Sequence, residues 1–163
     1  MAILISFVWL LVGVLLQVLL FNRLHVEGGI VLFYLYVLLK VPVEVRRPLQ
    51  ILMGFLTGLA VDVFCNTPGM HALAAATTMW LREPVLRMFV DAEDFAAGPP
   101  SVASPGLSVF VRYAAVLIAL HCMVLYGVEA FSLFHWISLI LKISISLLLT
   151  LLMSLAAELA WGR

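Results

Sequence analysis

The sequence predicts an all-α integral membrane protein, folded as a six-helix transmembrane bundle. Hydrophobic residues make up 65% of its 163 residues and charged residues only 11%, a balance outside the range of soluble domains. The mean hydropathy is +1.19, and the apolar residues gather in long stretches. At about 20 residues a span, the chain has room for about six helices and little extramembrane mass. We therefore expect residues 1–163 to form a single transmembrane domain.

The first two helices are predicted at residues 3–21 and 29–43. In the first helix, Gly13 and Gln17 are four residues apart and share a face, which we expect to pack on protein. The second helix is expected to end or kink at Pro42, because proline cannot continue a regular helix. The polar turn between the two helices holds three candidate interface residues: Asn22, Arg23 and His25.

The third helix, predicted at residues 49–65, carries the most informative pattern in the chain. Gly54, Gly58 and Asp62 lie four residues apart, so two small residues and a carboxylate project from one helix face. The glycines let another backbone approach closely, either inside the bundle or across a protein interface. A carboxylate at this depth is costly unless it faces protein, a cavity or a partner. A strong turn signal follows: Asn66-Thr67-Pro68-Gly69.

The fourth helix, at residues 70–89, is the least regular span. Its apolar part, residues 70–81, is short for a bilayer, so a re-entrant or tilted half-helix is the alternative to a full span. Residues 82–89 alternate basic and apolar side chains, which is typical of an amphipathic segment lying in the membrane interface. We expect Arg82 and Arg87 to face partners there.

The last two helices are predicted at residues 107–127 and 134–161, after a flexible cytoplasmic loop at residues 90–106 that is rich in Gly, Pro and Ser. The final helix carries polar residues at intervals of four, so neighbouring members lie on adjoining positions of one face. We expect this row to form a protein-facing seam. Its members are Ser138, Lys142, Ser146, Thr150, Ser154 and Glu158.

The distribution of basic residues favours a full crossing by the fourth helix. With six spans and a cytoplasmic amino end, seven basic residues are cytoplasmic and only Arg23 is external. If residues 70–81 do not cross, the split becomes three against five, contrary to the rule that positive loops stay inside. We therefore expect both termini in the cytoplasm. The seven are Lys40, Arg46, Arg47, Arg82, Arg87, Arg112 and Arg163.

In this topology Asp62 and Lys142 both lie near the external surface, so the two side chains are able to meet. The structural interpretation is an ion pair that fixes helix packing, formed by Asp62 with either Lys142 or Arg23. The alternatives are a carboxylate capped by the turn at residues 66–67, a partner-facing group, and a substrate or ion site. The sequence leaves these open.

Several function classes are disfavoured. The net charge is zero and there is no basic tract, which argues against nucleic acid as a partner. The four histidines lack metal-ligand spacing, and both cysteines lie in or beside apolar segments, so we expect no metal or cofactor. The sequence holds no paired carboxylates within its helices and no nucleophile or nucleotide motif, so we expect no catalytic activity.

An ordered set of residues runs through the first half to two-thirds of the chain. It comprises Gln17, the turn at residues 22–25, Tyr34, Tyr36, Pro42 and, above all, Gly54-x3-Gly58-x3-Asp62-x-Phe64 followed by Asn66-Thr67-Pro68-Gly69-Met70-His71-Ala72. This set resembles the rod shape-determining protein MreD family. The last two helices match that family only in hydropathy. The family in turn resembles the six-helix substrate-binding subunits of energy-coupling-factor transporters.

The resemblance implies a non-catalytic scaffold subunit of the bacterial elongasome in the cytoplasmic (inner) membrane. It implies binding of the single-span protein MreC, and work with MreB, RodA and a penicillin-binding transpeptidase in peptidoglycan synthesis. On this view Gly54, Gly58 and Asp62 organise the bundle, while Arg46 and Arg47 face cytoplasmic partners. The alternative is a solute-binding subunit of an uptake transporter, with a pocket lined by Asp62, Lys142, Gln17 and Tyr34.

Overall fold

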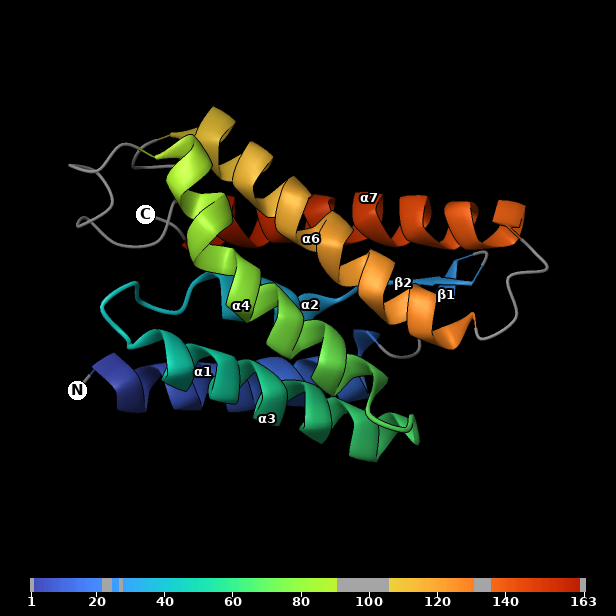
Figure 1. Cartoon of the computed structure of the whole chain (residues 1–163), viewed down its shortest axis with the longest axis horizontal. Coiled ribbons are helices and arrows are strands. Elements are labelled where there is room, and N and C mark those ends of the chain that lie inside the picture. Colours follow the sequence, from blue (N-terminus) through green and yellow to red (C-terminus); the bar gives the residue numbers. More distant parts are fainter. Residues whose placement is uncertain (1, 22–24, 27, 91–105, 131–135, 162–163) are drawn as a thin grey trace.

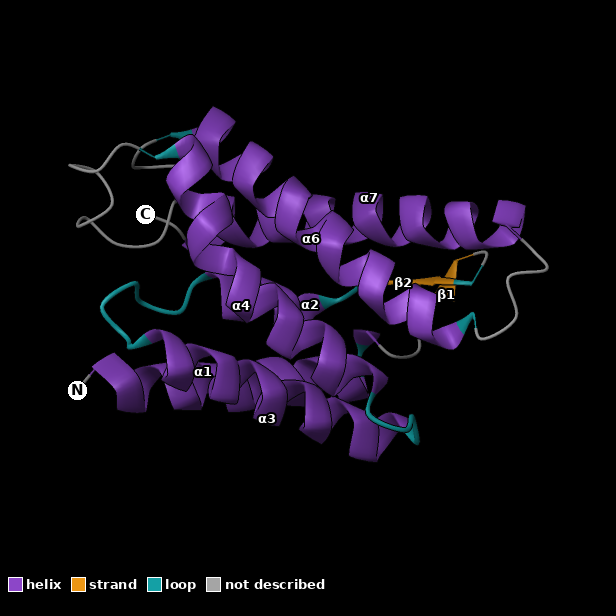
Figure 2. Cartoon of the chain, in the orientation of Figure 1, coloured by secondary structure: helices purple, strands orange, loops and turns teal. Residues whose placement is uncertain are grey.

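The computed structural model describes residues 2–21, 25–26, 28–90, 106–130 and 136–161. Apart from one pair of two-residue strands, the regular secondary structure of this part of the chain is helical (Figure 2), so the all-α prediction is confirmed. In chain order the elements are α1 (Ala2–Leu19), β1 (His25–Val26), β2 (Gly29–Ile30), α2 (Phe33–Leu39), α3 (Arg47–Cys65), α4 (Met70–Phe89), α6 (Leu107–Glu129) and α7 (Trp136–Trp161).

Three of the described helices are long and apolar enough to cross a membrane: Arg47–Cys65, Leu107–Glu129 and Trp136–Ala160. A further apolar helix, Ser6–Leu19, is shorter. Successive helices run in alternating directions, and both ends of the chain lie at the same end of the bundle (Figure 1). We call this the terminal end. The turn between α2 and α3 also lies there, whereas the turn between α3 and α4 lies at the far end (Figure 1).

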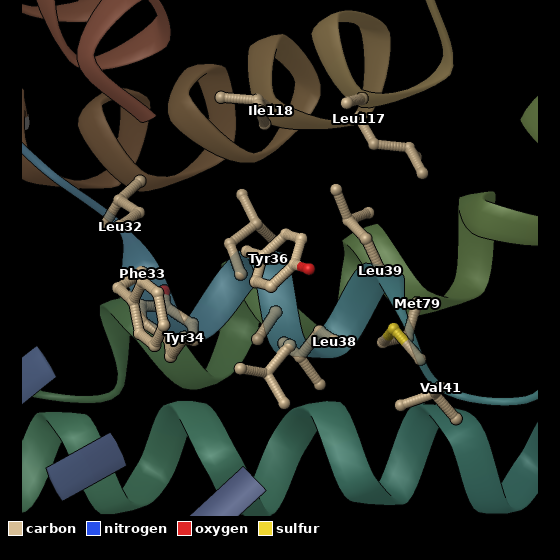
Figure 3. Close-up of a cluster of buried hydrophobic side chains, with 14 of the residues drawn as sticks. Leu32, Phe33, Tyr34, Tyr36, Leu38, Leu39, Val41, Met79, Leu117 and Ile118 are labelled. Carbon is tan, nitrogen blue, oxygen red and sulfur yellow. The ribbon is translucent and has the colours of Figure 1, made fainter. Parts of the chain in front are cut away.

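Residues 29–41 run through the middle of the bundle, and we call them the threaded segment. They comprise β2, an extended stretch and the seven-residue helix α2. Every residue from position 31 to position 39 is buried. Leu117 of α6 and Met79 of α4 point toward this segment (Figure 3), and α1 and α7 also pack against it. The threaded segment is therefore the centre of the hydrophobic core.

The predicted second helix at residues 29–43 is wrong in extent. Residues 29–30 instead form an antiparallel hairpin with residues 25–26, in which Val26 lies opposite Gly29. Gly28 has a φ of +79°, a left-handed conformation that favours glycine, so the chain turns at this point. The extended stretch before Phe33 persists because side chains of α1 and α7 hydrogen-bond to its backbone.

The helix α4 is continuous over Met70–Phe89, the bounds predicted for the fourth helix, so residues 82–89 extend this helix and do not form an element of their own. Pro84 lies inside this helix and has no N–H group to donate to the carbonyl of Trp80. Arg47 supplies the missing donor, because its Nη2 lies 2.8 Å from the Trp80 oxygen. The helix continues through the proline and carries Arg82 into the bundle.

The glycine face of α3 packs against α4. A Cβ atom added to Gly54 would lie 2.6 Å from Met79 Cγ, and one added to Gly58 would lie 2.6 Å from Ala72 Cα. These separations leave no room for a side chain, so the two glycines allow the helix backbones to approach closely. The small-residue face is thus used inside the bundle, which decides between its two predicted uses.

Candidate functional site

Asp62 caps the start of α4 from the preceding helix. Its Oδ1 accepts the backbone N–H of His71 at 3.0 Å, and its Oδ2 accepts that of Ala72 at 2.8 Å. The Thr67 hydroxyl also donates to Oδ1, at 2.5 Å. Gly69, at the N-cap position of α4, has no side chain to provide these acceptors. Asp62 therefore satisfies the helix start and places its charge at the positive end of the helix dipole.

The predicted ion pair of Asp62 with Lys142 does not form. Lys142 Nζ lies 2.9 Å from Glu129 Oε1 instead, near the far end of the bundle. Arg23, the other predicted cation, lies outside the described residues. The structure favours the capping alternative, through Thr67, because Asp62 is only 3% exposed and the turn supplies a donor to its carboxylate.

A double charge exchange tests this assignment. We expect Asp62→Lys with Lys142→Asp to be no more stable than Asp62→Lys alone, because the two side chains serve different partners. Glu129→Lys with Lys142→Glu should instead recover most of the loss caused by either single change. That loss is expected to stay below about 1 kcal/mol, since the pair is 31% and 44% exposed. Unfolding in detergent measures the stability of both double variants. If Asp62→Lys with Lys142→Asp is more stable than Asp62→Lys alone, Asp62 and Lys142 do form a pair.

Gln17 of α1 holds the start of α2. Its Nε2 donates to the carbonyl of Val31 at 2.9 Å, and its Oε1 accepts the N–H of Phe33 at 2.7 Å. Leu32, the N-cap residue of α2, makes no side-chain cap of its own. Gly13, one turn before Gln17, allows α1 to lie against Val37. The predicted packing of this face on protein is confirmed.

Two hydroxyl groups of α7 complete the start of the threaded segment. Ser146 Oγ accepts the N–H of Ile30 at 2.9 Å, and Thr150 Oγ1 accepts the N–H of Leu32 at 3.0 Å. Non-helical backbone away from water needs such partners, because each unpaired N–H costs free energy. The polar residues of α7 thus replace hydrogen bonds that a regular second helix would make internally.

The predicted seam of α7 is confirmed for its last four members, which are buried: Ser146, Thr150, Ser154 and Glu158. Glu158, which is 1% exposed, lies 3.0 Å from Lys40 Nζ and accepts the Tyr36 hydroxyl at 3.0 Å. Ser138, in contrast, is exposed, and Lys142 turns to Glu129. Residues four apart drift by about 40° per step around an α-helix, so the first members of the row leave the buried face.

Arg82 closes the other end of α2. Its Nη2 donates to the carbonyls of Leu39, at 3.2 Å, and Val41. Its Nε donates to Tyr113 Oη at 3.0 Å and its Nη1 to Gln50 Oε1 at 2.9 Å. The positive charge thus lies at the carbonyl end of α2, where the helix dipole favours it. Since Arg82 is only 1% exposed, its predicted role at a partner interface is wrong.

The variant Arg82→Lys should lower the free energy of unfolding by about 2 kcal/mol, because an ammonium group cannot bridge four acceptors as the planar guanidinium does. The matched control is Arg112→Lys, since Arg112 is exposed and its one partner among the described residues is Ser108 on its own helix. We expect Arg112→Lys to lower the free energy of unfolding by less than about 0.5 kcal/mol. Thermal and denaturant unfolding in detergent compare the two, and equal losses would refute the capping role.

Tyr34 connects two histidines at the centre of the bundle, which sequence reasoning missed. Its hydroxyl lies 3.1 Å from His71 Nδ1 and 2.7 Å from His121 Nε2. His121 Nδ1 lies 3.0 Å from Thr78 Oγ1, whose hydrogen is donated to the carbonyl of Ala74 at 2.7 Å. No spacing signal exists for this cluster, because its members come from three different elements.

The Thr78 hydroxyl sets the direction of this hydrogen-bond chain. Because its only hydrogen goes to Ala74, His121 Nδ1 must carry a hydrogen and donate to it. Neutral His121 then accepts at Nε2 from Tyr34, and Tyr34 accepts from His71 Nδ1. This series of hydrogen bonds ends at a helix carbonyl, so its effect is to hold α2 against α4 and α6.

The other predicted residues that the structure describes lie at the two ends of the bundle. Gly69 has a φ of +78° in the turn at the far end, next to exposed Pro68. Asn22 and Arg23 lie outside the described residues, and His25 lies in β1. Three predicted arginines are exposed near the terminal end, where α3 begins and α4 ends: Arg46, Arg47 and Arg87.

Comparison with known proteins identifies no relative. No family model matches the chain, and no curated protein or solved structure matches it. The four residues of the solute-pocket alternative are each held by different partners: Asp62 by the α4 start, Lys142 by Glu129, Gln17 by the α2 start and Tyr34 by two histidines. That alternative and the likeness to transporter subunits stay predictions.

Proposed function

We propose that this protein is a non-catalytic scaffold subunit of the bacterial cell-elongation complex, as its resemblance to the MreD family implies. It lies in the cytoplasmic membrane and binds MreC, a single-span membrane protein. Through this contact it helps to position or regulate peptidoglycan synthesis by RodA and its penicillin-binding transpeptidase, together with MreB on the cytoplasmic side.

One observation carries the proposal: the interior polar side chains are bonded to groups of the protein itself, and several of them are bonded to its backbone. Asp62, Gln17 and Arg82 each satisfy the N–H or C=O groups at a helix end. Within the described residues, every buried side-chain nitrogen and oxygen has a partner. A catalytic or solute site needs polar groups directed at a ligand. Groups committed to the backbone favour a rigid body that acts through its outer faces.

A six-pass arrangement with both termini in the cytoplasm is part of this proposal. The 20 residues of α4 cover about 30 Å, which matches the hydrocarbon core, and α4 runs antiparallel to α3 and α6 (Figure 1). Exposed basic residues at the terminal end favour a cytoplasmic position for that end, since positive loops stay inside. They are Arg46, Arg47, Arg87 and Arg112.

The outer face of α7 is the surface we assign to MreC. Only 17% of the spanning residues of α7 are buried in the bundle, against 39% for α3 and for α6. Its exposed side combines large apolar residues with small ones, among them Ala156 and Ala160 one turn apart. Small residues let a second helix approach closely in a membrane, where packing drives association.

Co-purification with tagged MreC from bacterial membranes tests the proposal. We expect stoichiometric recovery of MreC with the unchanged chain, and at least tenfold less with Ala156→Leu and Ala160→Leu combined. Gly127→Leu is the matched control, because it adds a side chain at an exposed position of α6 with open space around it.

Equal recovery with the α7 variant would refute the assigned face, and no recovery with the unchanged chain would refute the scaffold. Thermal stabilisation of the isolated chain by a small solute would instead support the transporter alternative.

A further inference from the structure

A cavity of about 190 Å³ is lined by residues of the α2–α3 turn, the start of α3 and the second half of α4. The turn and the end of α4 lie at the terminal end of the bundle (Figure 1). Its lining includes three arginines, Arg46, Arg47 and Arg82, and two acids, Glu44 and Glu83. A single water needs only about 10–15 Å³ of such space, so the cavity has room for a polar group of several atoms.

The positive charges of this cavity are under-compensated. Glu83 is held by Arg87 outside the lining, at 2.6 Å. Arg82 is 1% exposed and bonds only to neutral groups, and no carboxylate of the described residues lies within ion-pair distance of it. A buried cation without a counter-ion is costly. Glu44 alone is left to oppose the three arginines of the lining.

The cavity also holds unused hydrogen-bond donors. Four of the five N–H groups of Arg82 have acceptors, which leaves one on Nη1 beside Gln50. The guanidinium of Arg46 is exposed and bonds to no described residue. Arg47 commits one donor nitrogen to the Trp80 carbonyl. Planar guanidinium groups with free donors match the oxygens of a phosphate group.

We propose that this cavity binds the phosphate of an anionic lipid head group. Trp80 is 53% exposed, and its backbone carbonyl accepts a hydrogen bond from Arg47, so an exposed tryptophan lies next to the basic turn in the fold, the kind of residue that is enriched at the membrane interface. Exposed apolar residues continue from this level along α3, beginning with Leu52, Phe55 and Leu56. A phosphate on the arginines and acyl chains along this face reproduce the placement of a bilayer lipid.

Lipid titration of the purified full chain in neutral detergent tests the proposal. We expect phosphatidylglycerol in mixed micelles to raise the unfolding temperature, whereas phosphatidylcholine and inorganic phosphate at equal ionic strength leave it nearly unchanged. Arg46→Gln should raise the half-saturating phosphatidylglycerol concentration about fivefold, as expected for the loss of one cation beside a head group. Glu44→Gln should lower it by a few-fold.

The control is Arg112→Gln, which removes the same charge at the same end of the bundle but outside the cavity. It should leave the half-saturating concentration unchanged. Equal effects of Arg46→Gln and Arg112→Gln, or equal stabilisation by both lipids, would overturn the site. If inorganic phosphate raises the unfolding temperature as much as phosphatidylglycerol does, the cavity binds a soluble phosphate and the lipid assignment is wrong.

Discussion

Replacement of Asp62 by leucine is expected to lower the free energy of unfolding by about 3 kcal/mol or more. The change removes the acceptor of two backbone N–H groups and of the Thr67 hydroxyl, all at the start of α4 or in the turn before it. Loss of an N-cap alone costs about 0.5–2 kcal/mol, and hydrogen bonds to a charged group are worth about 1.5–3 kcal/mol each. Denaturant titration of the purified protein in detergent measures the loss.

Two companion variants make this result specific. Val63→Ala changes the next residue of α3, which is 72% exposed, and should cost less than about 0.5 kcal/mol. Thr67→Val removes only the hydroxyl donor and should cost about 1 kcal/mol, leaving the cap of α4 in place. A small loss in Asp62→Leu, comparable with that of Val63→Ala, would show that the carboxylate does not hold the turn.

Gly58→Leu is expected to destabilise the bundle by about 3 kcal/mol, at the upper end for an overpacked core. Even the first carbon of the new side chain would meet the His71 carbonyl and lie 2.6 Å from Ala72 Cα. Both are backbone atoms of α4, so relief requires the two helices to separate. That movement also pulls the His71 and Ala72 N–H groups away from Asp62. Thermal unfolding in detergent provides the measurement.

Gly127→Ala is the matched control for this substitution. Gly127 lies in α6 with open space around its Cα, and alanine is the better helix former by up to about 1 kcal/mol. The two glycine variants should therefore shift stability in opposite directions. Destabilisation of similar size in both would mean that α3 and α4 do not approach as closely as the geometry of Gly58 requires.

The sequence predicted the bounds of the five long helices to within two residues, and the fourth, predicted at residues 70–89, is observed as Met70–Phe89. The third helix, predicted at residues 49–65, is observed as Arg47–Cys65, and the last, predicted at 134–161, as Trp136–Trp161. The prediction failed where the backbone depends on distant side chains. Residues 29–32 are extended because Gln17, Ser146 and Thr150 pair with this stretch, and no local pattern reveals partners that lie 14 to 118 residues away.

For the polar residues too, the sequence predicted which positions matter but not which groups they contact. Their positions in apolar segments marked Asp62, Gln17 and the α7 row as important, because such groups are expensive in a bilayer. Their partners were wrong or unknown: Asp62 binds the next helix rather than Lys142, and Arg82 lies inside the bundle rather than at its surface. The link between Tyr34 and His121 gave no signal in the sequence at all.

Composition and periodicity alone determined that this chain is an all-helical protein with membrane-spanning stretches, and that its few intrahelical polar groups face protein. Composition and periodicity are sufficient for this prediction because both are local properties that can be evaluated within each segment. Which backbone group each polar side chain satisfies was decided only in three dimensions. A carboxylate or amide accepts from whatever N–H group the packing brings within about 3 Å, and that depends on how closely glycine faces such as that of Gly58 let the helices meet.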